Sequence, residues 1–175
     1  MNFTLFPTLV TQRLILRQLE ERDDAAIFSL RSDDRVNRFV VRPKQTHIGE
    51  ARAFISKINT GIARNEWIYW AITLKDEPTL IGTICIWNIS ADKKTGELGY
   101  ELTPAQQGKG IMKEAIGKII EFAFHELAIN TLEAFTHKEN TGSTKLLLEY
   151  NFILQTGRED PDNKNNTVFT LSNTG

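Results

Sequence analysis

The residues with the clearest chemical potential lie in a glycine-rich segment from Gly99 to Met112, with the sequence GYELTPAQQGKGIM. A predicted strand leads into this segment, and a predicted long helix begins at its end. The first N–H groups of a helix have no partner within the helix and carry a partial positive charge. Glycine also lets a ligand approach the backbone closely. The segment therefore predicts an anion site, most naturally one for a phosphate or pyrophosphate.

Two common phosphate motifs do not fit this loop. The dinucleotide pattern G-x-G-x-x-G fails because Lys113 stands at the position of its last glycine. The P-loop pattern fails because Thr103 replaces its first glycine and Gly110 stands where Ser or Thr is needed. The spacing that remains is Gln107-x-x-Gly110-x-Met112. A plain glycine loop that opens a helix is the alternative interpretation of the loop taken alone.

This spacing resembles the Q/R-x-x-G-x-G/A pyrophosphate signature of the GNAT acetyltransferases, which bind acetyl-coenzyme A there. Two further segments resemble the same superfamily, namely residues 140–143 (NTGS) and 150–152 (YNF). The chain looks most like the RimJ/RimL branch, which includes the ribosomal-protein-alanine N-acetyltransferases, in residues 99–102 (GYEL), Pro104, residues 108–115 (GKGIMKEA) and the opening 11–17 (TQRLILR). The resemblance covers about residues 8–172 in the right order.

The resemblance implies a single N-acetyltransferase domain over residues 1–175, with an α+β fold. That fold is a central mixed, mostly antiparallel sheet of about seven strands flanked by about four helices. The resemblance also implies acetyl-CoA as cosubstrate. No metal is expected, because the single cysteine and the spacing of the three histidines match no metal-ligand pattern. The residues expected to bind acetyl-CoA are those in the matched segments: Tyr100, Leu102, Gln107, Gly108, Lys109, Gly110, Ile111, Met112, Asn140 and Ser143.

The strand that carries Tyr100 and Leu102 has an expected special role. In this superfamily the strand splays from its neighbour, and its backbone pairs with the pantetheine amides. Gly99 interrupts a well-formed strand here, which predicts a β-bulge or a close backbone approach.

The resemblance implies direct transfer of an acetyl group from the thioester to a neutral amine. An α-amine has a pKa near ~7.8 and a lysine near ~10.4, so deprotonating lysine costs about 3 kcal/mol more. Glu97 is the predicted catalytic base, because some superfamily members place their base on this strand. It lies on the face opposite Leu98 and Tyr100. A solvated hairpin glutamate is the alternative, and Glu101 is a weaker candidate that resembles a surface residue.

The departing thiolate needs a proton donor. Many relatives supply a tyrosine from the helix after Asn140, but Leu147 stands at the matching position in this sequence. Ser143 is the nearest remaining hydroxyl and is predicted to contact the thioester sulfur. An ordinary serine in the first turn of a helix is the alternative. Tyr150 is predicted to be a packing residue.

The expected acceptor is the α-amine of a protein or peptide N-terminus. Alternatives are a small amine (polyamine, amino acid or antibiotic) and a non-catalytic acyl-CoA-binding module, which the missing tyrosine keeps open. Three arginines before Pro43, namely Arg35, Arg38 and Arg42, could receive an acidic peptide or form a solvated loop. Superfamily members often dimerise, so a homodimer also stays open.

The composition excludes several other classes of protein. The 175 residues carry 21 Lys+Arg and 22 Asp+Glu, so there is no global basic field to bind nucleic acid as a main role. The single cysteine, Cys85, excludes an internal disulfide. No apolar run approaches the ~20 residues of a membrane span, and the start lacks the features of a signal peptide. We therefore expect a cytoplasmic protein with no membrane partner.

Hydrophobic periodicity predicts the elements that must position these residues. Strands are predicted over residues 11–19, 67–74, 80–89, 97–102, 131–136, 152–156 and 167–171. Helices are predicted over residues 21–31, 47–64, 109–127 and 142–150. The central strands form two hairpins in series, while the later strand–helix–strand units need parallel crossovers, so the sheet should be mixed.

Overall fold

The alternating apolar residues of the predicted strands pair into one sheet of eight strands in the computed structural model, which describes residue 3 and residues 5–173. The strands are β1 (Leu9–Val10), β2 (Leu14–Arg17), β3 (Ile68–Leu74), β4 (Glu77–Trp87), β5 (Thr95–Leu102), β6 (Thr131–His137), β7 (Ile153–Leu154) and β8 (Asn166–Ser172). The α-helices are α1 (Asp24–Ser32), α2 (Asp34–Asn37), α3 (Ile48–Ala63), α4 (Ile111–His125) and α5 (Thr141–Glu149). Two 3₁₀ turns, η1 (Glu21–Asp23) and η2 (Pro104–Gln106), precede α1 and follow β5.

The order of the strands confirms the predicted mixed, mostly antiparallel α+β sheet. It runs β1-β2-β3-β4-β5-β6-β8-β7, and only β5 and β6 are parallel. The α4 helix supplies the crossover between these two strands. The sheet has eight strands rather than about seven, because the two residues Leu9 and Val10 pair with β2 as a short edge strand.

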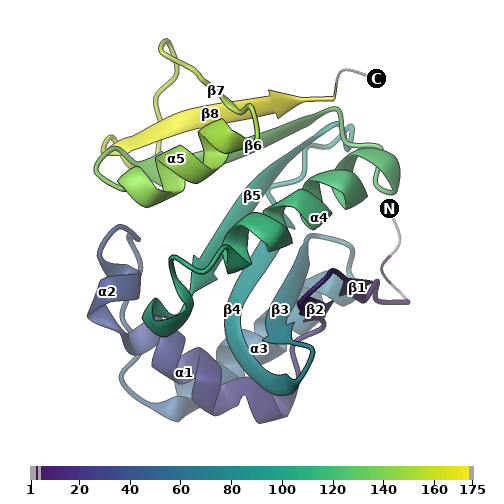
Figure 1. Cartoon of the computed structure of the whole chain (residues 1–175), viewed down its shortest axis with the longest axis vertical. Helices are drawn as coiled ribbons and strands as arrows, with labels where there is room; N and C mark the ends of the chain where they lie inside the picture. The colour runs from purple at the N-terminus through teal and green to yellow at the C-terminus, as the bar shows by residue number, and fades with distance from the viewer. Residues whose placement is uncertain (1–2, 4, 174–175) are drawn as a thin grey trace.

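The parallel pair β5–β6 is short and opens into a split. Pairing joins Thr95–Glu97 only to Thr131–Glu133, although both strands continue beyond these residues. In Figure 1 the two strands diverge from this joined end, toward the side where α2 and the start of α5 lie. The predicted splaying of this strand from its neighbour is therefore confirmed.

Helices cover both faces of the sheet. In Figure 1, α4 and α5 lie on the near face and α3 on the far face, and α1 packs against α3. On the near face, Trp70 meets Phe122 of α4 edge-on, with ring centroids 5.5 Å apart. On the far face, Phe54 of α3 meets Tyr69 in the same way at 5.7 Å. No helix among the described residues is both long and apolar enough to cross a membrane.

Several predicted element bounds shift for local reasons. The helix predicted over residues 109–127 begins at Ile111, because Gly110 takes a left-handed φ of 74° as its N-cap. Pro78, which lies between the predicted strands 67–74 and 80–89, belongs to the start of β4. The predicted strand 152–156 contracts to the two residues of β7, and Phe152 turns into the core instead.

Candidate active site

The glycine-rich loop between β5 and α4 has the open backbone that the sequence predicts. Gly108 and Gly110 both have a φ of 74°, which side chains other than glycine rarely adopt. A Cβ at Gly108 would meet nothing within 4 Å, so the loop faces open space there. The side-chain amide of Gln107 donates to the Leu102 carbonyl at 3.1 Å and ties the loop to the end of β5.

The start of α4 offers unpaired backbone donors next to this loop. Its first backbone hydrogen bond runs from the N–H of Glu114 to the Gly110 carbonyl, so the amides before Glu114 have no partner within the helix. The side chains of Ile111 and Met112 are buried in the core. These two residues can therefore reach a ligand only through their backbone.

Contacts from the segment between β1 and β2 hold the loop, and the sequence analysis did not assign them. Arg13 donates from Nε to Glu114 at 2.6 Å and from Nη1 to the Lys109 carbonyl at 2.9 Å. Thr11 and the Arg13 backbone N–H also donate to the Glu114 carboxylate. The only signal in the sequence was the opening segment 11–17, which carried a resemblance but no role.

The two lysines near the loop already have polar partners. Lys109 contacts the Gln106 side chain at 3.2 Å, and Lys113 pairs with Glu149 of α5 at 3.0 Å. Lys109, a predicted cofactor-binding residue, is exposed and lies in the loop between Gly108 and Gly110.

A pair of hydroxyl groups joins β5 to α5. The phenol oxygen of Tyr100 lies 2.7 Å from Oγ of Ser143. Burial raises the pKa of Tyr100 to about 12, so the phenol keeps its proton at neutral pH. The sequence analysis assigned Tyr100 for its backbone alone and missed this side chain. The alternation of Leu98, Tyr100 and Leu102 places the phenol on this face but does not reveal its partner.

Asn140 has a structural role at the start of α5. Its side-chain oxygen accepts a hydrogen bond from the backbone N–H of Ser143 at 3.2 Å and so caps the helix. The cap orients the first turn of α5 and thereby places Ser143 opposite Tyr100.

Leu147 and Tyr150 are packing residues. Leu147 is fully buried in the core. Tyr150 donates to the Lys113 carbonyl at 2.6 Å and packs over Gly117, which confirms its predicted packing role. Asn151 adopts a left-handed φ of 60° at the following turn.

Glu97 lies on the opposite face of β5, at the closed end of the split. Its Oε2 accepts a hydrogen bond from the Asn88 side chain at 2.7 Å. Burial raises the pKa of Glu97, and the nearby charges of Asp160 and Glu133 act in the same direction. Glu133, its neighbour across the strand pair, is neutralised by Arg158. A carboxyl with a raised pKa beside the split between β5 and β6 has the properties of a general base.

Gly99 lies on the same face of β5 as Glu97. The pairing between β4 and β5 runs without interruption from Trp87 and Glu97 to Gly82 and Leu102, so the predicted β-bulge is wrong. The close approach is to a side chain instead, because a Cβ at Gly99 would lie 3.0 Å from Sγ of Cys85. On this face β5 therefore carries no side chain of its own between its two glutamates, and Cys85 of β4 lies beside the glycine.

The expectation that Glu101 is a surface residue is wrong. Only 9% of its side chain is exposed, and it faces Arg31 of α1 and Arg42 of the loop before α3. Of the three arginines before Pro43, Arg42 alone pairs with Glu101. Arg35 pairs with Asp33 in solvent, and Arg38 lies over the Phe39 ring. Sequence patterns missed this arrangement because it joins residues from three separate segments.

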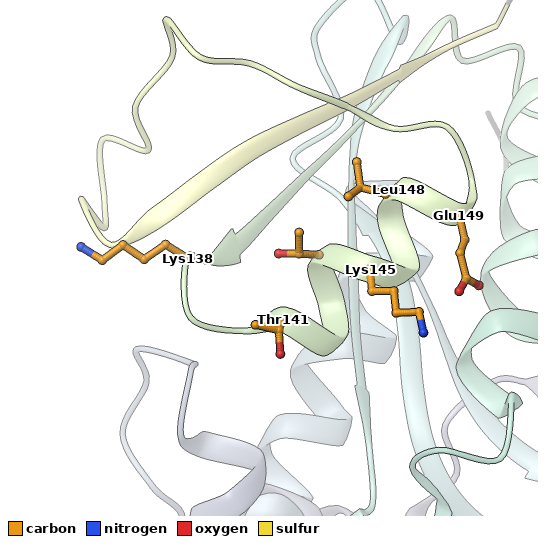
Figure 2. A pocket seen from close by; sticks show the side chains of 6 residues that line it. Lys138, Thr141, Lys145, Leu148 and Glu149 are labelled. Atoms are coloured by element: carbon orange, nitrogen blue, oxygen red, sulfur yellow. The ribbon is translucent and has the colours of Figure 1, made fainter.

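A surface hollow of about 480 Å³ lies outside this arrangement, on the outer side of α5. Its lining residues are Lys138, Thr141, Thr144, Lys145, Leu148 and Glu149. In Figure 2 the side chains of Lys138 and Lys145 point away from each other at opposite ends of the hollow. None of the predicted site residues lines it. No group of His, Cys, Asp and Glu side chains that could hold a metal comes together within residues 3 and 5–173.

Comparison with known proteins identifies relatives of the chain. The model of the family described as "Acetyltransferase (GNAT) domain" matches residues 13–153. The uncharacterized N-acetyltransferase YoaA of Bacillus subtilis is 32% identical over 148 residues, which cover 85% of this chain and 84% of that protein.

Solved structures share the fold at lower sequence identity. RimL, a ribosomal alpha-N-protein acetyltransferase in complex with coenzyme A, has a TM-score of 0.81 at 17% identity and covers 94% of this chain and 97% of its own. A ribosomal-protein-alanine acetyltransferase from Vibrio fischeri has a TM-score of 0.77 at 20% identity. The match covers 96% of this chain and 97% of that protein.

Proposed function

The chain belongs to the GNAT family of acetyltransferases and is an acetyl-CoA-dependent N-acetyltransferase, and we propose that its acceptor is the α-amine of a protein or peptide N-terminus. The observation that carries the proposal is the split between β5 and β6. A carboxylate with a raised pKa lies on one face of β5 beside it, and a pair of hydroxyl groups lies on the other.

The residues beside the split fit acetyl-CoA. The loop Gln107–Met112 and the free amides at the start of α4 suit a pyrophosphate, because backbone N–H groups at a helix N-terminus bind anions. The edge of β5 beyond Glu97 has no pairing with β6, so its peptide groups at Tyr100 and Leu102 are available to the pantetheine amides. Bound acetyl-CoA would supply an activated acetyl group, and CoA would leave as the thiol.

Glu97 acts as the base in this proposal. Its carboxylate takes a proton from the incoming ammonium, directly or through a water molecule, and so leaves a neutral amine. The pKa of an α-amine is near ~7.8 and that of a lysine is near ~10.4. A carboxylate with a raised pKa therefore takes a proton more readily from an α-ammonium than from a lysine. Asn88 holds the carboxylate in place through its hydrogen bond to Oε2.

Tyr100 and Ser143 act as the proton donor. The Tyr100 phenol is protonated at neutral pH and shares a short contact with the Ser143 hydroxyl. Either oxygen can therefore deliver a proton to the departing sulfur while the other replaces it. This pair offers a donor although Leu147 stands where many relatives carry a tyrosine.

An acceptor panel tests the proposed acceptor. The protein is supplied with acetyl-CoA and three acceptors: a peptide that begins with Ala or Ser, the same peptide with a blocked N-terminus and an internal Lys, and a polyamine. Mass spectrometry should find acetylation of the free α-amine and little product with the other two. Faster acetylation of the lysine or the polyamine would contradict the proposal. Acetyl-CoA binding without any turnover would instead favour a non-catalytic module.

A further inference from the structure

An unbalanced charge cluster lies on the same face of β5 as Glu97. Nη2 of Arg42 is 2.6 Å from Oε2 of Glu101, and Nη1 of Arg31 is 3.6 Å from Oε1. Two guanidinium groups therefore meet one carboxylate, which leaves one positive charge uncompensated. The side chains of Arg31, Arg42 and Glu101 are 16%, 14% and 9% exposed, so the cluster is largely buried but keeps an edge in solvent.

The neighbours of the cluster do not supply the missing negative charge. Tyr69 shares a 3.0 Å contact with Thr83, whose hydroxyl lies 3.4 Å from Glu101, and burial raises the pKa of Tyr69 well above its usual range. Asn37 accepts from Nε of Arg42 at 2.8 Å. The acidic residues at the start of α2 have other partners, since Asp33 pairs with Arg35 and Asp34 with Lys44.

Several polar atoms of the cluster also lack hydrogen-bond partners. Within the described residues, Nε of Arg31, Nη2 of Arg42 and Oε1 of Gln45 are buried and make no hydrogen bond, since the Arg42–Glu101 contact is an ion pair without hydrogen-bond geometry. Gln45 is 7% exposed, and its backbone N–H donates to the Arg31 carbonyl. A buried charge without full pairing destabilises a fold, so such a site points to a ligand that completes it. Guanidinium groups are matched in shape and charge to carboxylates.

The position of the cluster relates it to the transfer reaction. Glu97 and Glu101 lie four residues apart on one face of β5, which is about 13 Å along a strand. Gly99 between them leaves that stretch without a side chain. The α-amine and α-carboxylate of one amino acid are too close together to reach both ends. An extended peptide advances about 3.3–3.6 Å per residue and can span the distance with its first four residues.

We propose that Arg31 and Arg42 select peptide acceptors that carry an acidic side chain within their first four residues. This inference rests on the proposed function, because it assumes that the peptide α-amine lies at Glu97. The carboxylate of the peptide would complete the unbalanced cluster beside Glu101, while the peptide backbone lies over Gly99.

A set of matched peptides tests the inference on the unaltered protein. C-terminally amidated octapeptides begin with Ala and carry Glu, Gln or Lys at position three, with a second set substituted at position four. The kcat/KM for the Glu peptide should exceed that for the Gln peptide by about tenfold at one of the two positions, as expected for one charge-assisted contact. The Lys peptide should be the poorest. Added salt should reduce the advantage of Glu, because salt screens the exposed edge of the cluster.

Variants then locate the selectivity. The substitution Arg42→Gln should remove most of the preference for Glu over Gln, mainly through KM. The matched control is Arg35→Gln, in the neighbouring helix α2, where Arg35 is exposed and paired with Asp33, and it should keep the preference. Preference retained in Arg42→Gln would overturn the assignment.

The failure of this inference and that of the proposed function give different results. Equal kcat/KM for the Glu, Gln and Lys peptides would overturn the inference while α-amine acetylation stands. If no peptide is acetylated but a polyamine is, the proposed function fails as well. The peptide comparison on the unaltered protein decides the matter even if Arg42→Gln does not fold.

Discussion

At the scale of single residues, Glu97 pairs a catalytic benefit with an energetic penalty. Burial and neighbouring carboxylates raise its pKa, so the folded state binds a proton more tightly than the unfolded chain does. Stability supplied by such a group is fully present below the pKa of the unfolded chain. It is lost as the pH rises through the folded pKa. At neutral pH the charged carboxylate therefore destabilises the fold.

Replacing Glu97 with Gln should separate these two effects. The variant should lose about 100-fold or more in kcat, the usual contribution of a general base. It should melt at a higher temperature than the unaltered protein at about pH 7.5. The difference should vanish below about pH 4, where the carboxyl of Glu97 is protonated in both the folded and the unfolded protein. Thermal melts at several pH values and initial rates check this. The control Glu121→Gln, on the exposed side of α4, should change neither property much. Full activity in the Glu97→Gln variant would remove Glu97 from the mechanism.

The hydroxyl pair yields a second prediction at this scale. Tyr100→Phe and Ser143→Ala should each lower kcat by about 10-fold or more while acetyl-CoA affinity changes little, because the donated proton matters in the transition state. Tyr150→Phe is the control, since it loses a hydrogen bond to the Lys113 carbonyl and about 1 kcal/mol of stability but no catalytic group. Rate measurements with calorimetric titration of acetyl-CoA distinguish these outcomes. A normal kcat in both Tyr100→Phe and Ser143→Ala would rule out the pair as donor.

At the scale of elements, the sequence predicts the strands, helices and loop well. It does not predict which side chains of distant segments contact each other. Alternation correctly places Leu98, Tyr100 and Leu102 on one face, and the glycines correctly mark the start of α4. Periodicity reports which face a side chain takes, not its partner on a distant segment. The contacts Arg13–Glu114 and Tyr100–Ser143 join residues 101 and 43 positions apart, so they required the tertiary structure.

The loop before α4 gives the prediction for this scale. Gly108→Ala and Gly110→Ala should each destabilise the protein by about 1–2 kcal/mol, because both positions need a left-handed φ. Both should also weaken acetyl-CoA binding, since a shifted loop no longer presents its amides. Gly157→Ala, in open space without such a φ, should do neither. Melting temperatures and titration calorimetry test this, and unchanged affinity in both loop variants would argue against the loop as the pyrophosphate site.

At the scale of the whole molecule, the sheet behaves as two parts joined by a short seam. Three residue pairs connect β5 to β6, and beyond them the parts separate. On the near face, Tyr150 and the Lys113–Glu149 ion pair tie α5 to α4. The width of the split is therefore set by helix packing on one side and by the seam at its closed end. The mixed sheet was predictable from the hairpins and crossovers, whereas the extent of the seam was not, because strand propensity continues through both strands.

The most direct test of the account is hydrogen–deuterium exchange of the protein with and without acetyl-CoA. Binding in the split predicts slower exchange in two segments, β5 from residue 98 to 102 and the loop with the start of α4 from residue 107 to 113. Protection confined to the outer side of α5, around the hollow in Figure 2, would contradict the account, as would no protection at all under saturating acetyl-CoA.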